Sequence, residues 1–225
     1  MIFLQIVSDT VTGGGQQARQ SLSVIDVMIR GGFMMLPIIA LLGVLIYFFI
    51  ERIRLITQAN QDPTTFMTSV KELVLKGDIA TAKSLCTETN TPVALMIEQG
   101  IARLGRPLKH IETSMENTAK AEIFKLEKNI AVVATIGGVA PMIGFLGTVI
   151  GMVKGYSAIA HDEGVVSPKL LSAGIYESLI TTIAGLVVGI MAYVAYNYLV
   201  LSLQNVTHVM ERTAVDFVDL LQEPQ

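Results

Sequence analysis

The chain has 225 residues, of which 52% are apolar and 16% are charged, and its mean hydropathy is +0.57. A soluble domain usually carries about 25% charged residues, so this composition predicts a membrane protein. The net charge of −3 is too small to indicate a nucleic-acid partner. Because there is one cysteine, Cys86, the chain can form neither an internal disulfide nor a metal site with several cysteines. Cys86 lies on an apolar helical face, and we expect it to be buried as a small hydrophobic residue.

Residues 1–32 form a segment ahead of the first long apolar run. Within it, Leu22, Ile25 and Ile29 recur at helical spacing, which predicts a short amphipathic helix. Both a position on the membrane surface and packing on a partner protein fit this pattern.

Three runs are long and apolar enough to cross a membrane. Residues 33–50 and 130–153 carry no charged side chain, and residues 170–203 carry one, Glu177. A helix rises about 1.5 Å per residue, and the hydrocarbon core of a bilayer is about 30 Å thick. The sequence therefore predicts an all-α membrane protein with three transmembrane helices.

Residues 51–129 are expected to form a helical domain outside the membrane. Eleven Lys/Arg and ten Asp/Glu are interleaved between positions 51 and 128. Three helix-start signals divide the segment into short helices, because Ser, Thr and Asp cap helix N-termini and Pro is favoured in the first turn. These signals are Asp62-Pro63, Gly77-Asp78 and Thr91-Pro92.

Two of the transmembrane helices are expected to be long and to extend into this helical domain. No helix breaker appears between Pro107 and the second span, so one uninterrupted helix is predicted to enter the membrane there. A short polar loop follows at 154–169, and Ser167-Pro168 is a start signal for the third helix. The helical period continues through residues 204–225, which predicts a C-terminal extension of the third helix.

The basic residues predict the orientation of the spans. Eleven of the sixteen Lys/Arg lie between positions 51 and 128, whereas residues 1–32 and the loop at 154–169 hold two each. By the positive-inside rule, the helical domain and the C-terminal helix should be cytoplasmic. The N-terminus and the loop should lie on the opposite side.

Small residues recur along the second and third spans at intervals that allow helix backbones to approach closely in lipid. We expect them to pack the two helices together, and such patterns alone do not indicate transport. The residues are Pro141, Gly144, Gly147, Gly151 and Gly155 in the second helix, and Gly185 and Gly189 in the third.

Four polar side chains stand out within the spans: Thr148, Glu177, Thr181 and Thr182. An ionisable residue at this depth usually marks an ion or proton path. Counted from Lys154 and from Lys169, Thr148 and Glu177 should lie at a similar depth, roughly 9–12 Å inside the membrane, and Thr182 deeper, at roughly 20 Å. Two alternatives stay open. The threonine hydroxyls can donate to backbone carbonyls one turn earlier, and Glu177 can be a protonated acid bonded to a neighbouring helix.

Nothing in the sequence predicts an enzyme, a metal site or a cofactor. His110, His161 and His208 share neither a helical face nor the spacing of metal ligands. No candidate nucleophile has a base near it in the sequence.

Two motifs give the chain a family resemblance. Ala140 to Met152 reads APMIGFLGTVIGM, and Gly174 to Leu186 reads GIYESLITTIAGL. With the three-span layout, these segments resemble the MotA/TolQ/ExbB proton channel family over the chain from Phe33 onward. The three spans favour ExbB or TolQ over MotA, and the long N-terminal segment favours ExbB. The departures from the family pattern are Phe145, Ser178 and the extra hydroxyl of Thr181.

The resemblance implies roles for individual residues. Thr148 and Thr182 match the family's lumen threonines, and Glu177 matches its third-span glutamate, which leaves Thr181 as a neighbour. By this analogy alone, Thr182 rather than Thr181 would face the lumen.

The resemblance also implies a complex in the bacterial inner membrane, with the N-terminus in the periplasm. A homopentamer would surround a dimer of a single-span ExbD- or TolR-type partner and use the proton motive force, in the ExbB branch through TonB, to drive outer-membrane active transport. The alternatives are a TolQ-type subunit that serves outer-membrane integrity and a non-conducting membrane scaffold.

Overall fold

The computed structural model describes residues 31–161 and 168–222, and this part of the chain is helical with short connections and without strands. Three of its helical stretches are long and apolar enough to cross a membrane. The predicted fold class, an all-α membrane protein with two long helices, is confirmed. The amphipathic helix predicted ahead of residue 31 lies outside the described residues. The helices are α3 (Met35–Ala59), α4 (Thr64–Leu75), α5 (Ile79–Thr89), α6 (Pro92–Ile101), α7 (Leu108–Glu127), α8 (Ile130–His161) and α9 (Pro168–Gln222).

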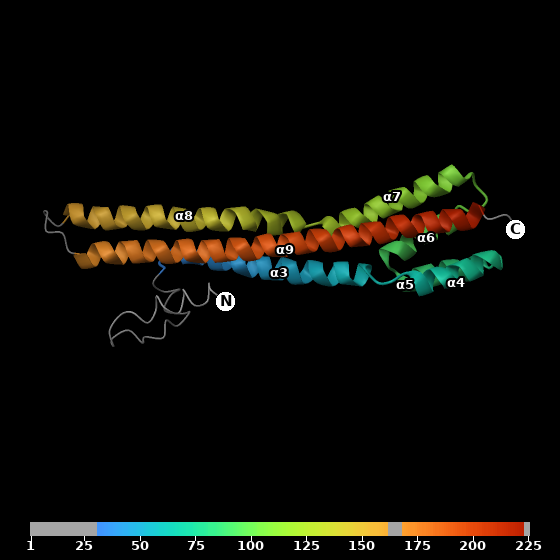
Figure 1. Cartoon of the computed structure of the whole chain (residues 1–225), viewed down its shortest axis with the longest axis horizontal. Helices are drawn as coiled ribbons and strands as arrows, with labels where there is room; N and C mark the ends of the chain where they lie inside the picture. Colours follow the sequence, from blue (N-terminus) through green and yellow to red (C-terminus); the bar gives the residue numbers. More distant parts are fainter. Residues whose placement is uncertain (1–30, 162–167, 223–225) are drawn as a thin grey trace, which may run out of the picture.

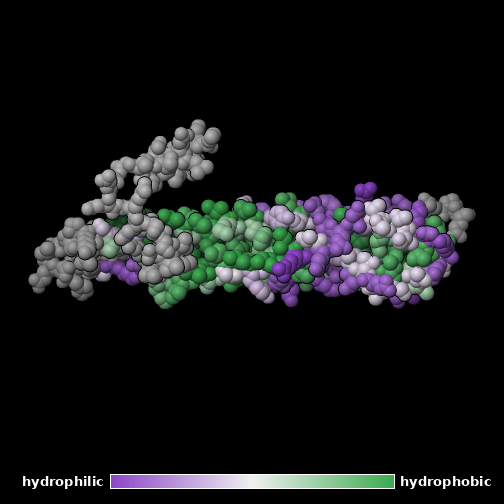
Figure 2. Space-filling view, turned by 90° about the horizontal axis from the view of Figure 1, so that it is seen from below, coloured by the Kyte–Doolittle hydropathy of each residue, from purple (hydrophilic) through white to green (hydrophobic). Residues whose placement is uncertain are grey.

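The molecule is elongated and has two halves (Figure 1). In the membrane half, α3, α8 and the first part of α9, to residue 203, lie side by side. In the polar half, α4 to α7 surround the rest of α9, from residue 204. Figure 2 shows apolar side chains over the membrane half and hydrophilic side chains gathered over the polar half.

Helix α9 runs through both halves as one helix of 55 residues. After Gly189 it contains neither glycine nor proline, so nothing in its sequence interrupts the backbone hydrogen bonds. The predicted helical continuation of the third helix past residue 203 is confirmed as far as Gln222.

The predicted uninterrupted helix from Pro107 into the second span is wrong at one point. Helix α7 ends at Glu127 and α8 begins at Ile130, because Asn129 adopts the left-handed conformation with φ +67°. Asparagine tolerates this conformation better than most residues. The sequence signal is weak, because asparagine also occurs inside helices.

Arg52 lies beside this break and ties α3 to α7. Its side chain is buried, and Nη1 donates to the backbone oxygen of Lys125 at 3.2 Å. That oxygen is one of the last carbonyls of α7, where a cation is favoured by the helix dipole. Nη2 pairs with Glu51 at 3.0 Å, whereas Nε has no hydrogen-bond partner among the described residues.

The predicted helix starts of the polar half agree with the structure to within one residue. Asp78 accepts a hydrogen bond from the backbone N–H of Thr81 and caps α5, and Thr91 caps α6 in the same way, through the N–H of Ala94. Helix α4 begins at Thr64, one residue later than the start signal predicts.

The core of the polar half forms where the short helices cover α9. Phe217 of α9 is fully buried, as are Met96 and Ile97 of α6 and Met115 of α7. Cys86 is also fully buried, which confirms the prediction for this residue, and burial raises the pKa of its thiol to about 11.

Candidate functional site

The seam between α8 and α9 is closed by contact between the two backbones. A Cβ atom built on Gly185 would lie 2.6 Å from the carbonyl oxygen of Ala140 and 2.8 Å from Cα of Gly144. Neither atom belongs to a flexible side chain that could move away. Glycine is therefore required at position 185 if the helices are to keep this separation.

Other small residues let side chains fit into the same seam. A Cβ on Gly189 would lie 2.5 Å from Cγ of Pro141, so the proline ring occupies the space that glycine leaves. Gly147 makes room in the same way for the side chain of Thr181. Gly151 faces Ser178, and Gly155 lies against Gly174.

Thr181 and Thr182 of α9 both face α8, but they differ in how far their side chains are exposed. Thr181 is 1% exposed, and its hydroxyl donates to the backbone oxygen of Ser178 at 2.9 Å. Thr182 is partly exposed, and its hydroxyl lies 3.1 Å from the oxygen of Gly144 and 3.3 Å from that of Ser178. Thr181 is thus enclosed in the seam, and Thr182 lies at its edge.

Thr148 lies on α8 at the same level as these threonines. Its side chain is partly exposed and donates to the backbone oxygen of Phe145 at 2.5 Å. Its own carbonyl lies 3.3 Å from the hydroxyl of Ser178, which also donates to Gly174 at 2.7 Å. In this single chain every one of the three threonine hydroxyls is bonded to a backbone carbonyl, as the alternative interpretation expected.

The relative depths predicted from the two lysines are wrong. Gly147 contacts Thr181, so Thr148 is level with that threonine, whereas Glu177 lies about one helical turn nearer the loop, where the side chain of Lys154 reaches it. The count treated Lys154 and Lys169 as equivalent boundary marks, but α8 continues for seven residues beyond Lys154. Glu177 is therefore the outermost of the four polar residues, and Thr148 and Thr182 lie at similar depth.

Glu177 is held by an ion pair across the seam. Its Oε1 atom lies 3.0 Å from Nζ of Lys154, and the two side chains are 27% and 56% exposed. The turn ahead of α3 also reaches this carboxylate, because a Cβ on Gly32 would collide with Oε1 of Glu177. Gly32 has φ +64°, a conformation that favours glycine independently of this contact.

Sequence reasoning missed two members of this site, Lys154 and Ser178. In the sequence, Lys154 serves only as a boundary mark for counting depth, and Ser178 stands out only as a departure from the family pattern. The register between α8 and α9 is needed to place either residue beside its partner. The available signal was the single cation near the loop end of the second helix, Lys154, and the single anion of the third span, Glu177.

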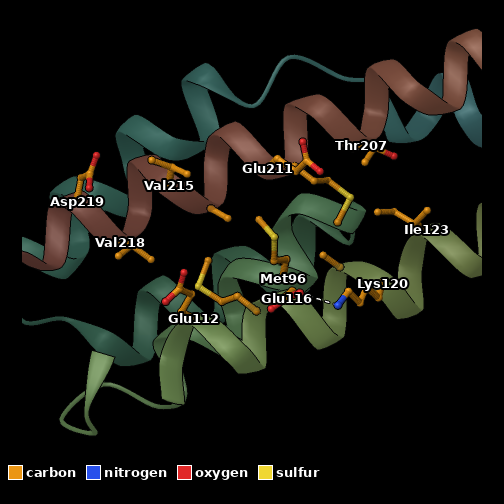
Figure 3. Close-up of a pocket in the computed structure, with 14 residues that line it drawn as sticks. Met96, Glu112, Glu116, Lys120, Ile123, Thr207, Glu211, Val215, Val218 and Asp219 are labelled. Carbon is orange, nitrogen blue, oxygen red and sulfur yellow. Dashed lines mark hydrogen bonds and ion pairs between the residues drawn. The ribbon is translucent and has the colours of Figure 1, made fainter. Parts of the chain in front are cut away.

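A separate groove of about 450 Å³ lies in the polar half between α6, α7 and α9 (Figure 3). Methionine and aliphatic side chains line it, and Lys120 pairs with Glu116 at 2.6 Å on its edge. The groove begins thirty residues along α9 from Glu177, so it is not part of the seam. The described residues contain no cluster of three His, Cys, Asp or Glu side chains that could hold a metal ion. Three further acidic residues line the groove: Glu112, Glu211 and Asp219.

Comparisons with known proteins show the family to which the residues of this site belong. A model of the MotA/TolQ/ExbB proton channel family matches residues 88–212, which include the whole α8–α9 site. The chain is 31% identical over 176 residues to a putative biopolymer transport protein ExbB homolog of Methanothermobacter thermautotrophicus. That match covers 76% of this chain and 61% of the relative, so the chain spans less than two thirds of that protein's length.

Two bacterial relatives give shorter matches. The biopolymer transport protein ExbB of Aquifex aeolicus is 34% identical over 136 residues, which is 60% of this chain and 84% of that protein. A Tol-Pal system protein TolQ of Haemophilus influenzae is 31% identical over 112 residues, which is 50% of this chain and 47% of the relative.

Proposed function

Because the chain belongs to the MotA/TolQ/ExbB proton channel family, we propose that it is the proton-conducting subunit of an energy-transducing complex in the bacterial inner membrane. The observation that carries this proposal is the polar strip at the α8–α9 seam. A carboxylate and four hydroxyl groups lie there within about two helical turns of each other, inside two otherwise apolar spans.

The residues of this strip are suited to proton transfer. Glu177 can bind and release a proton, and it is the outermost member of the strip. A threonine hydroxyl can both donate and accept a hydrogen bond, so Thr148 and Thr182, at the partly exposed edge of the seam, can pass a proton inward. Thr181 is enclosed against Gly147 and would position its neighbours.

One chain does not complete the path, because its threonine hydroxyls are bonded to their own backbone. We propose that a homopentamer encloses a lumen and that a dimer of a single-span ExbD- or TolR-type partner supplies an acid there. In this arrangement the polar half and the C-terminus lie in the cytoplasm and the N-terminus in the periplasm. Each proton that crosses 100 mV releases roughly 2.3 kcal/mol, so mechanical work requires several.

We place the chain in the ExbB branch, with a TonB-type protein as the recipient of the work and outer-membrane active transport as its use. Two of the relatives described above carry the name ExbB, and one carries the name TolQ. A TolQ-type role in outer-membrane integrity is the second candidate. Co-purification with an ExbD-type or a TolR-type partner, followed by a subunit count, distinguishes the two.

The test is proton flux into liposomes that contain the purified complex. Glu177→Gln, Thr148→Ala and Thr182→Ala should each abolish or strongly reduce flux while the complex still assembles. Thr135→Ala is the matched control, because Thr135 is an exposed threonine of α8 whose hydroxyl also bonds to a backbone carbonyl, that of Ala131. Unchanged flux in all three site variants would instead show that these residues do not carry the protons, and a wild-type complex without flux would favour a non-conducting scaffold.

A further inference from the structure

The ion pair between Lys154 and Glu177 joins the two helices of the site at its outer end. The carboxylate oxygen and the ammonium nitrogen are 3.0 Å apart, although the residues are 23 positions apart in the sequence. The contact therefore depends on the register of α8 against α9, which the glycine seam fixes. Among the described residues, Lys154 is the ionic partner that the structure gives Glu177.

Lys154 reduces the cost of placing a carboxylate in an otherwise apolar span. A lone carboxylate between apolar helices is unfavourable, and a cation at hydrogen-bond distance compensates for much of that penalty. The turn ahead of α3 brings the backbone of Gly32 against the carboxylate, without a charged side chain at that position. On α9 itself the adjacent residues are Tyr176, which is 40% exposed, and Ser178, which is buried.

Lys154 is more exposed than its partner, and its chain is flexible. More than half of its side-chain surface is open, compared with about a quarter for Glu177. Lysine has a long stem with several rotatable bonds, so its ammonium group can swing away from the seam while Glu177 stays in place. The pair can therefore open without any change in the packing of α8 and α9.

We propose that Lys154 is a positioning residue that gates proton uptake: it holds Glu177 as a carboxylate across the α8–α9 seam, and this ion pair must open before Glu177 accepts a proton. This inference rests on the proposed function, because it assigns Lys154 a part in the same pathway. When Glu177 takes up a proton, the proton replaces the ammonium group of Lys154 at the carboxylate oxygen. The ammonium group returns to water.

The experiment compares Lys154→Met and Lys154→Arg in the complex with its single-span partner, reconstituted in liposomes. Proton flux is measured at a series of external pH values under a fixed membrane potential. Lys154→Met removes the ion pair that must open before proton uptake, so it should move the half-maximal pH of flux upward. Lys154→Arg keeps the charge and should retain the wild-type midpoint.

Lys76→Met is the matched control, because Lys76 forms an ion pair with Glu72 in the polar half, far from the seam. It should leave the pH profile unchanged. A purely structural role for Lys154 would lower the amount of assembled complex in Lys154→Met and leave the midpoint where it is, and that result overturns the proposal.

A spectroscopic measurement separates the two proposals. Infrared difference spectra report the C=O band of a protonated carboxylic acid, and Glu177→Gln identifies the part that belongs to Glu177. In Lys154→Met this band should appear at higher pH than in the wild type. A wild-type complex without flux overturns the proposed function, whereas a band at the same pH in both proteins overturns the role of Lys154.

Discussion

The two halves of α9 are packed by opposite means. In the membrane half, α9 meets α8 through positions that have no side chain, so that Gly185 touches the backbone of Ala140 and Gly144. In the polar half, the same helix presents large side chains, and Phe217 fills the space between the short helices.

This difference follows from the solvent on each side. In lipid there is little hydrophobic gain from burying a leucine against another helix, so close backbone approach and hydrogen bonds hold the helices together. In water, burial of apolar surface is the main driving force, and large side chains supply most of it. We therefore expect substitutions that add atoms to destabilise the membrane half, and substitutions that remove atoms to destabilise the polar half.

The largest effect is expected from Phe217→Ala, which removes a fully buried ring. The cavity that it leaves should lower the free energy of unfolding by about 3–5 kcal/mol. Val215→Ala is the control, because Val215 is 58% exposed on the same helix, and a change at such a surface position should stay within about 0.5 kcal/mol. Thermal unfolding of the complex, followed by circular dichroism, measures both variants. Equal effects would contradict a core built around Phe217.

Gly185→Ala adds a single carbon to the seam. Because the nearest atoms belong to the backbone, α8 and α9 must move apart, and overpacking of this kind costs about 1–3 kcal/mol. The hydroxyl of Thr182 should lose its contact with Gly144, so we also expect reduced proton flux. Gly138→Ala should be neutral in the same thermal and flux assays, because the described residues place no atom outside its own stretch of helix within 4 Å of the added carbon.

Thr91→Ala tests the helix cap of α6, which has no counterpart in the seam. Loss of the hydrogen bond to the N–H of Ala94 should destabilise the polar half by about 1 kcal/mol. Thr113→Ala serves as the control, since Thr113 is an exposed mid-helix threonine bonded to the carbonyl of Lys109. A control variant as unstable as the cap variant in chemical denaturation would argue against the capping role.

The smallest effect on stability is expected at Cys86, whose buried thiol has a pKa of about 11. Because the folded-state pKa is raised above the usual 9.0, this group stabilises the fold fully below pH 9, and that contribution is lost as the pH rises toward 11. At pH 8 we expect a maleimide to label Cys86 slowly until the polar half unfolds. A cysteine at the exposed position 84, as Ser84→Cys in a Cys86→Ala background, should react at once.

The helices and most of their ends could be predicted, because each depends on local chemistry. Uncharged runs, the caps at Asp78 and Thr91, and the absence of breakers in α9 are all readable along the chain. The turn at Asn129 could not be predicted in the same way. A left-handed asparagine depends on how α7 and α8 pack at each end of the turn, and sequence spacing carries no such information.

The residues of the candidate site could be predicted from the sequence, but their positions relative to one another could not. Glu177 and the threonines stand out because polar groups are rare in apolar spans. Their relative depth depends on the register of two antiparallel helices. Counting from Lys154 as a boundary mark predicted this register incorrectly. The same register creates the contact between Lys154 and Glu177, so the error and the missed residue have one cause.

The unbroken course of α9 makes it a rigid lever between two compartments. At about 1.5 Å per residue its 55 residues measure roughly 80 Å. A rotation of about 5° around its midpoint would displace each tip by roughly 3–4 Å, in opposite directions, without breaking a backbone hydrogen bond. In the proposed function, a small tilt of α9 near Glu177 would thus become a sideways displacement at Phe217 in the polar half.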